Sequence, residues 1–83
     1  MKLVLVQWVD SAQTIRWTYL DEIRETPLQC ASAGWIVKKT KEALTIAPHV
    51  SAEQDKSPHQ GCGSMTIPMK AISKITELRY DRR

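Results

Sequence analysis

The sequence predicts a small, mainly β protein: a barrel of five strands with one short helix between the first and the second strand. The chain has 83 residues, 42% of them hydrophobic and 25% charged, which is typical of a single soluble globular domain. Its apolar residues lie in short runs that are rich in β-branched side chains. Turn-forming residues separate these runs, so one domain is expected over residues 1–83, with the barrel at 2–80 and a basic C-terminal tail at 81–83.

The first strand and the helix are expected in the N-terminal third of the chain. The first strand covers Leu3–Val9 and is apolar on both faces, so it lies centrally in a sheet or under a partner subunit. After it, Trp17, Leu20 and Ile23 recur every three residues with acidic residues between them, which predicts an amphipathic helix of about two to three turns. Pro27 follows this helix and stops it, because the residue before a proline avoids helical angles.

Two strands are expected in the middle of the chain. The second strand covers Leu28–Lys39, and Gly34 inside it indicates a sharp bend or a bulge. The third strand covers 44–50, where apolar and polar residues alternate with a period of two. Pro48 places the end of that strand at a sheet edge or a bulge.

The C-terminal half supplies the last two strands. Residues 51–60 form the one real loop, and residues 62–67 alternate as a fourth strand. A single turn at 68–71 leads into 72–80, which fits a helix or a strand and in which β-branched residues favour the strand. A strand, a short helix and four further strands describe a barrel of the SH3-like or Sm-like kind. In Sm-like rings the open edges pair with the next subunit.

The charge is uneven along the chain. Residues 1–27 carry a net charge of −1, residues 28–69 carry +1, and residues 70–83 carry +3, which together make the formal +3 of the chain. A basic end attracts phosphates, although it also serves simply as a solubilising tail. The first apolar run, Leu3–Val6, is too short for a signal sequence or a membrane span. These features predict an intracellular protein with no membrane partner and with reduced cysteines.

Six short segments of the chain follow one another in a specific order: Val6–Ser11, Trp17–Ile23, Pro27–Trp35, Leu44–His49, Gln60–Pro68 and Ala71-Ile72. Together they resemble a family of small proteins that bacteriophages encode, whose barrel is similar to Sm-like folds. The resemblance covers residues 3–78 and implies a phage origin, an all-β fold and the cytoplasm of an infected bacterial host. It brings no catalytic motif. By analogy, unrelated phage proteins of this size are homo-oligomers that sequester nucleotide signals of bacterial immunity.

Neither a metal site nor an active site is indicated. The soft metal ligands are His49, His59, Cys30 and Cys62, and His59 with Cys62 has the spacing of half a zinc site. No second close pair completes that site. The one carboxylate cluster, at residues 21–25, has helical spacing and is expected to be a solvated face. We therefore predict no metal, no cofactor and no enzymatic activity.

The segment Gln60–Ser64 is a candidate phosphate-binding turn. Glycines on both sides of Cys62 allow a concave run of backbone N–H groups that can hold a phosphate. Ser64 and Thr66 add hydroxyl groups, and His59 adds a charge when protonated. The same glycines equally suit a bulge or a hairpin, and the lysine and the helix start of a P-loop are missing.

The aromatic residues offer a second way to hold a ligand. Trp8 and Trp35 lie inside strands and are expected in the core. Trp17 is expected to staple the helix to the barrel, whereas Tyr19 points to another face and is the candidate for an exposed stacking platform. Tyr80 lies among arginines, where it stacks on a base or packs its ring on the barrel.

These features predict a non-enzymatic homo-oligomer. Its predicted function is to bind and sequester a phosphorylated, nucleotide-type ligand between subunits. So short a chain has a marginal core, which favours self-assembly. The expected ligand contacts are Arg16, Tyr19, Lys38, His49, His59, Gln60, Ser64 and Thr66. Two alternatives stay open. One is an Sm-like RNA-binding ring that uses Lys38, Lys39, Lys41 and the basic C-terminus, and the other is an inhibitor that covers a host enzyme through an exposed apolar edge.

Overall fold

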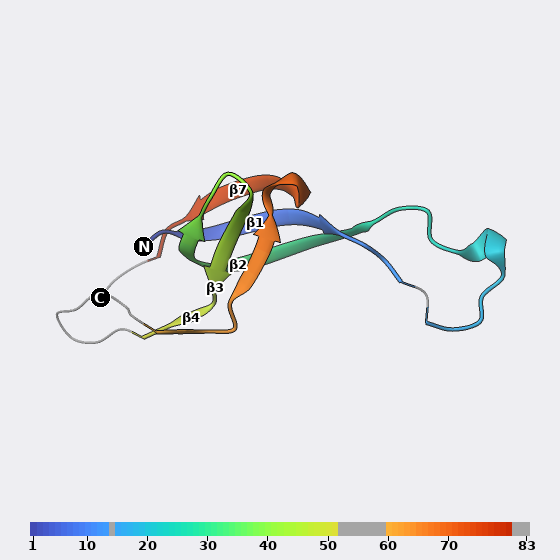
Figure 1. Ribbon diagram of the computed structural model, residues 1–83, viewed down its shortest axis with the longest axis horizontal. Helices are drawn as coiled ribbons and strands as arrows, with labels where there is room; N and C mark the ends of the chain where they lie inside the picture. Colours follow the sequence, from blue (N-terminus) through green and yellow to red (C-terminus); the bar gives the residue numbers. More distant parts are fainter. Residues whose placement is uncertain (14, 52–59, 81–83) are drawn as a thin grey trace.

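The structure is a computed structural model that describes residues 1–13, 15–51 and 60–80. Within these residues a five-stranded antiparallel sheet has the order β6-β3-β2-β1-β7 (Figure 1). Its strands are β1 (Leu3–Asp10), β2 (Leu28–Lys39), β3 (Ala43–Ala47), β6 (Met65–Pro68) and β7 (Ile72–Leu78). A separate two-stranded ribbon consists of β4 (His49–Val50) and β5 (Gly61–Cys62). Two 3-10 turns are η1 (Leu20–Glu22) and η2 (Met69–Ala71).

The hydrophobic core covers one face of the sheet, here called the inner face. Its fully buried side chains alternate along three strands and are at most 2% exposed: Val4, Val6, Leu44, Ile46 and Ile67. The register places Val6 opposite Ile75 and Leu44 opposite Ile67, so these side chains gather on the same face. β1 lies between β2 and β7, which confirms that its two apolar faces reflect a central position in the sheet.

The predicted closed barrel is wrong for the part of the chain that the structure describes. β6 and β7 are the two edges of an open sheet, and they are linked by η2 rather than by a hydrogen-bonded ladder. Met69 and Ala71 of this turn are partly buried against the core. Side-chain packing therefore covers the gap between the two edge strands where a barrel would have backbone pairing.

The predicted helix between the first two strands is also wrong. The longest helical segment in the described residues has three residues, and between β1 and β2 only η1 forms. A helix of two or three turns is marginal on its own and becomes stable by packing its apolar face. Here that face has nothing beneath it, because Trp17 is 105% exposed and Leu20 is 86% exposed.

The glycine and proline positions in the middle of the chain are explained by the strand pairing. Gly34 is not at a bulge, since the register of β2 against β3 shifts between Ile36 and Lys38. It is buried, and a Cβ there would lie 3.0 Å from the carbonyl oxygen of Ala47, so its role is close backbone approach. Pro48 separates β3 from β4, so the chain breaks there between two sheets, and neither the sheet edge nor the bulge predicted at this residue is found.

The predicted third and fourth strands are each divided. The third continues past Pro48 only as the two residues of β4. The fourth breaks at Gly63, whose φ of 75° is in the left-handed region, and becomes β5 and β6. The last segment is a strand over Ile72–Leu78, as β-branching predicted, and the turn before it is present as η2. Most of the predicted loop at 51–60, residues 52–59, and the predicted tail at 81–83 lie outside the described residues.

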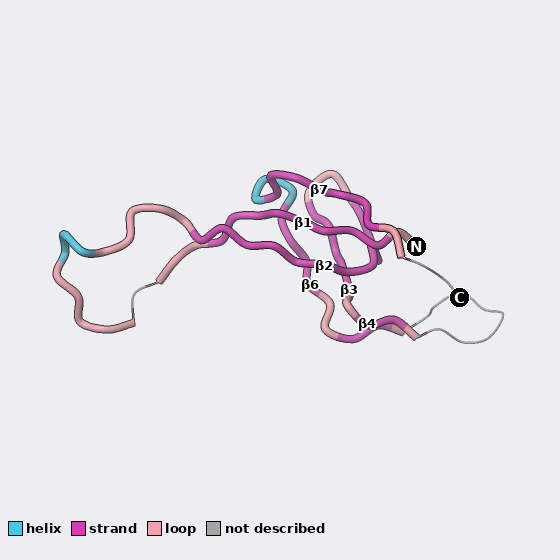
Figure 2. The backbone as a smooth tube through the Cα atoms, turned by 180° about the vertical axis from the view of Figure 1, so that it is seen from behind, coloured by secondary structure: helices cyan, strands magenta, loops and turns pink. Residues whose placement is uncertain are grey.

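The described residues between β1 and β2, 11–13 and 15–27, form a long excursion, here called the arm. Figures 1 and 2 show it projecting from one end of the sheet, continuing the direction of the β1–β2 hairpin. The molecule is accordingly elongated, with extents of 58 × 24 × 24 Å. No described helix is long and apolar enough to cross a membrane.

Candidate functional site

The eight predicted ligand contacts do not form one site. Arg16 and Tyr19 lie on the arm, whereas Lys38, His49, Gln60, Ser64 and Thr66 lie on or beside the ribbon of β4 and β5. In Figure 1 the arm and the ribbon are at opposite ends of the long axis. His59 lies outside the described residues. The predicted site is therefore divided in two: Arg16 and Tyr19 lie on the arm, and the other described contacts lie around the ribbon.

A cavity of about 280 Å³ lies between the ribbon and the sheet. Most of its wall is apolar, and three polar residues are among those that line it. The described residues that line it are Met1, Val37, Thr45, Ala47, Val50, Gln60, Gly61 and Ser64. An apolar wall with a few converging polar groups is the usual make-up of a small-molecule site, and this volume is at the small end for such sites.

Backbone hydrogen bonds fix Gln60 at this cavity. Its carbonyl oxygen accepts from the N–H of Ser51 at 2.8 Å, and its N–H donates to Ser51 Oγ at 3.1 Å. These two bonds occupy the backbone of Gln60. The side-chain amide makes no hydrogen bond with another described residue, so it keeps its two donors and its acceptor for a ligand.

A pair of hydroxyl groups lies at the edge of the cavity. The Oγ1 atoms of Thr45 and Thr66 are 2.8 Å apart and share a hydrogen bond, which connects Thr66 to the lining although it does not line the cavity itself. Lys38 is the register partner of Thr45, so its side chain starts on the same face of the sheet. Lys38 is exposed and lies beside the lining residue Thr45, and the lining includes Met1 with the N-terminal ammonium group.

The glycines of the predicted phosphate-binding turn have two different roles. Gly61 leaves room for the ribbon to approach the sheet, because a Cβ there would be 3.3 Å from the carbonyl oxygen of His49 and 3.4 Å from the Cβ of Ala47. Gly63 makes the left-handed turn that ends β5. Of the predicted alternatives, a bulge or a hairpin, the hairpin holds for Gly61, which lies in the two-stranded ribbon, whereas Gly63 lies in the turn after it. Of the turn, Gln60, Gly61 and Ser64 line the cavity.

His49 lies on the same ribbon but lines a different recess. That recess shares Val50, Gln60 and Gly61 with the cavity and also includes Cys62. His49 is exposed and pairs in register with Cys62. Across the described ranges, no group of three or more His, Cys, Asp or Glu residues is placed to hold a metal.

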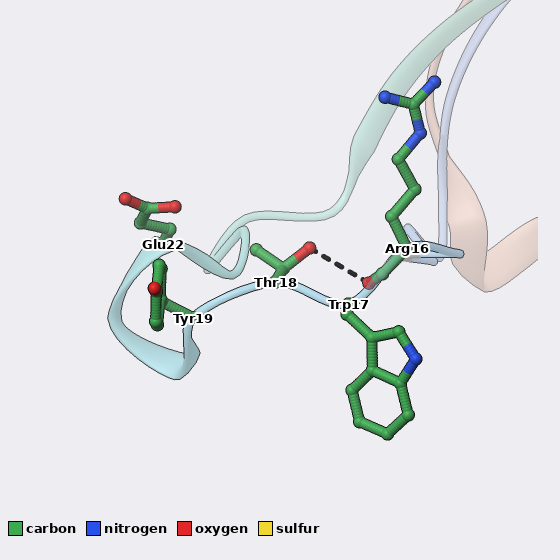
Figure 3. Close-up of a pocket in the computed structure, with 5 residues that line it drawn as sticks. All are labelled: Arg16, Trp17, Thr18, Tyr19 and Glu22. Carbon is green, nitrogen blue, oxygen red and sulfur yellow. Dashed lines mark hydrogen bonds between the residues drawn. The ribbon is translucent and has the colours of Figure 1, made fainter.

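The arm residues surround a hollow of about 560 Å³ at the tip of the molecule. Figure 3 shows its five lining side chains: Arg16, Trp17, Thr18, Tyr19 and Glu22. The guanidinium of Arg16 and the rings of Trp17 and Tyr19 extend in different directions rather than toward one another. Tyr19 is 79% exposed, as the prediction of an exposed aromatic requires, but Trp17 staples nothing to the sheet. Side chains that diverge in this way do not form a preorganised ligand site.

The other aromatic residues lie on the sheet. Trp8 is partly buried beside the core, and its Nε1 donates to Ser32 Oγ at 3.0 Å. Trp35 lies on the opposite face, where the ring of Tyr80 contacts it edge-to-face with centroids 5.4 Å apart. Tyr80 therefore packs on the sheet, which is the alternative predicted for it. Trp35 is only partly buried and does not belong to the core cluster.

Sequence reasoning missed part of the cavity wall. Thr45 and Ala47 lie in the segment with the cleanest alternation, and that alternation was the signal that these two residues share one face. Val50 falls on the opposite face in the same alternation, yet it lines the cavity with them. What the pattern did not contain was the break at Pro48, which brings the ribbon over this face. Comparison of the chain with protein-family models, curated proteins and solved structures found no match.

Proposed function

We propose that this protein is a non-enzymatic binding protein that holds a phosphorylated, nucleotide-type ligand in the cavity between the ribbon and the sheet. The observation that carries the proposal is the meeting of Gln60, Ser64 and Thr45 on an apolar wall. These residues come from β3 and from the two sides of β5, and they supply amide and hydroxyl groups. Such groups recognise the edge of a base or the hydroxyls of a sugar.

Lys38 is the proposed phosphate contact. Its position opposite Thr45 puts a cation at the edge of the cavity without burying the charge. Lys39 and Lys41 follow in the same hairpin, and the described residues outside the arm carry a net charge of +4. A cationic rim beside an apolar wall suits a ligand with one apolar, ring-like part and one phosphate.

Binding without turnover is supported by the chemistry of the described lining. It contains no carboxylate, imidazole or thiol, so Ser64 has no general base beside it among these residues. The proposed relationship to phage proteins with Sm-like barrels gives such binding a purpose, because a protein that holds a nucleotide signal without consuming it lowers the free concentration of that signal in an infected bacterium.

The experiment is a binding titration of the purified chain by calorimetry. The probes are ribonucleoside monophosphates, a 3′,5′-linked cyclic dinucleotide and a single-stranded oligoribonucleotide, each at low and at high salt. Saturable binding of a nucleotide is expected. Gln60→Leu and Ser64→Ala should each weaken it by about threefold to tenfold, since each removes a hydrogen bond to the ligand.

The matched control is Gln29→Leu, the same chemical change at an exposed position of β2 away from the cavity. It should leave the affinity unchanged. Binding of the oligoribonucleotide alone, with a steep dependence on salt and no effect of Gln60→Leu, would favour the RNA-binding alternative. Absence of binding to every probe, or equal losses in Gln60→Leu and Gln29→Leu, would contradict the proposal.

A further inference from the structure

The arm exposes more apolar surface than any other part of the described chain. Five of its large apolar side chains are exposed: Ile15, Trp17, Tyr19, Leu20 and Ile23. Trp17, at 105%, has its entire side chain in solvent. Large apolar side chains that gather in one exposed segment mark an interaction surface, whereas isolated ones need no explanation. Loops as long as residues 11–27 that have almost no secondary structure are usually functional when they belong to a compact domain.

A second apolar surface lies on the sheet face opposite the core, here called the outer face. The register puts Leu3 beside Trp35 and Leu5 beside Ala33 on this face. Leu3, Leu5 and Trp35 are only partly buried, and Val37 next to them is 50% exposed. The ring of Tyr80 is the one ring contact on Trp35 among the described residues. The centre of the outer face is therefore apolar and incompletely covered.

The two surfaces are complementary in charge. The arm has a net charge of −1, because Asp21, Glu22 and Glu25 outnumber its two arginines. On the outer face, Lys38 and Lys74 flank the apolar centre, and none of its described positions is acidic. Among the described residues the acids of the arm make no salt bridge, since the one salt bridge there joins Lys2 to Glu77.

The geometry separates the two surfaces within one chain. The arm begins after Asp10, whereas Leu3 and Trp35 lie at the other end of the β1–β2 hairpin. Seven residues of strand span about 23 Å. Figures 1 and 2 show the arm directed away from the sheet. A second copy in antiparallel orientation brings each arm over the outer face of the other copy, so that both contacts form at once in a two-fold arrangement.

We propose that the arm of one copy docks on the outer face of a second copy, and that the two copies exchange arms reciprocally. A buried Trp or Tyr covers about 150–250 Å² of surface. Two arms, each with Trp17, Tyr19 and three aliphatic side chains, reach the roughly 1,200–2,000 Å² that a stable interface buries. The complementary charges of arm and outer face within one sequence single out a second copy as the partner.

The test reverses the charges of the two surfaces in separate variants. The arm variant carries Asp21→Lys and Glu22→Lys, and the sheet variant carries Lys38→Glu and Lys74→Glu. Sedimentation velocity without ligand should show a dimer for the unaltered chain and a dissociation constant raised by about tenfold or more for each variant alone. An equimolar mixture of the two variants should form a heterodimer, because each arm then meets an outer face of opposite charge.

Two controls separate docking from folding and from simple net charge. The variant Lys41→Glu with Lys70→Glu changes the same number of charges outside the outer face and should leave the dimer intact. Trp17→Ala should weaken the dimer by about tenfold or more, as loss of a central aromatic anchor does, while circular dichroism stays unchanged. A monomeric unaltered chain at all concentrations would overturn the proposal. So would a mixture of the two variants that remains monomeric.

The proposed ligand site and the outer face share Val37 and Lys38, so the ligand site is tested apart from the dimer through cavity residues that lie outside the apolar centre of the outer face. Gln60→Leu and Ser64→Ala change the cavity but neither the arm nor the apolar centre of the outer face, so they should not affect dimerisation. Trp17→Ala should weaken arm docking without removing any lining residue of the cavity. A closed ring of more than two copies would overturn the two-fold exchange.

Discussion

The sheet and the arm contain the same kinds of apolar side chains, but those on the inner face of the sheet are buried and those of the arm are exposed. Leu44 and Leu20 both lie in segments with regular apolar spacing, yet Leu44 is fully buried and Leu20 is 86% exposed. The inner-face side chains of β1, β3 and β6 pack into one cluster, so strands that are far apart in the sequence bury one another's apolar residues. The arm has no such partner within the described chain. An apolar pattern thus shows that a segment needs to be covered, but not that its own chain covers it.

Removal of a core side chain is the largest effect that this comparison predicts. Leu44→Ala should lower the free energy of unfolding by about 2–5 kcal/mol, through lost burial and a residual cavity. Urea denaturation measures this loss. Because such a loss can unfold a small domain outright, Ile67→Val, with an expected loss of about 0.5–1.5 kcal/mol, keeps the test measurable. A core variant that unfolds at the unaltered midpoint would contradict the assigned core.

A methyl group at the closest approach of two strands should have the next largest effect. Gly34→Ala places a Cβ within 3.0–3.2 Å of three backbone atoms of Ala47, and backbone cannot turn aside as a flexible side chain can. We expect a loss of about 1–3 kcal/mol in the free energy of unfolding. Ala33→Ser, an added atom at an exposed neighbouring position, should change it by no more than about 0.5 kcal/mol. Equal effects of the two substitutions would show that the strands are not packed this closely.

Matched tryptophan substitutions in the two regions should differ by a smaller amount. Trp8→Phe removes the hydrogen bond from Nε1 to Ser32 Oγ at a partly buried site and should cost about 0.5–1.5 kcal/mol. Trp17→Phe removes no hydrogen bond seen in the described chain and should leave thermal unfolding of dilute protein unchanged. Thermal unfolding followed by circular dichroism compares the two. A larger loss for Trp17→Phe would mean that the arm packs on its own sheet in solution.

The smallest effect is expected on the arm itself. Leu20→Ala repeats the chemistry of Leu44→Ala at an exposed position and should change the free energy of unfolding by at most about 0.5 kcal/mol. The measurement is urea denaturation at a protein concentration where the chain is monomeric. A loss near that of Leu44→Ala under those conditions would remove the distinction between arm and sheet.

Much of the sheet was predictable because its signals are local. Alternation located β3, and β-branching assigned β7 to a strand. The arm was mispredicted because the spacing of Trp17, Leu20 and Ile23 is a helical signal only if another surface covers that side. The closed barrel failed for a related reason. Whether two edge strands pair depends on their distance and tilt, and no residue type records either.

The candidate site was also predictable only in part. Residue types alone singled out Gln60 and Ser64, and both line the cavity. Arg16 and Tyr19 suited a ligand equally well by type, but the chain places them at the far end of the molecule. Thr45 and Val50 were not selected, because their role arises only when the ribbon folds over the sheet. The chemical groups that can bind a ligand are known from the residue types, whereas the fold decides which of these groups lie together.

By itself the sequence determined the class of this protein: a small β domain whose first strand is apolar on both faces and whose C-terminal segment is basic. These properties follow from residue type and from a period of two, which act within a few neighbours. Only the tertiary structure decided that the sheet stays open, that the ribbon encloses a cavity, and that the apolar side chains of the arm remain exposed. Each of these depends on contacts between distant segments, and burial is a property of such contacts rather than of any one segment.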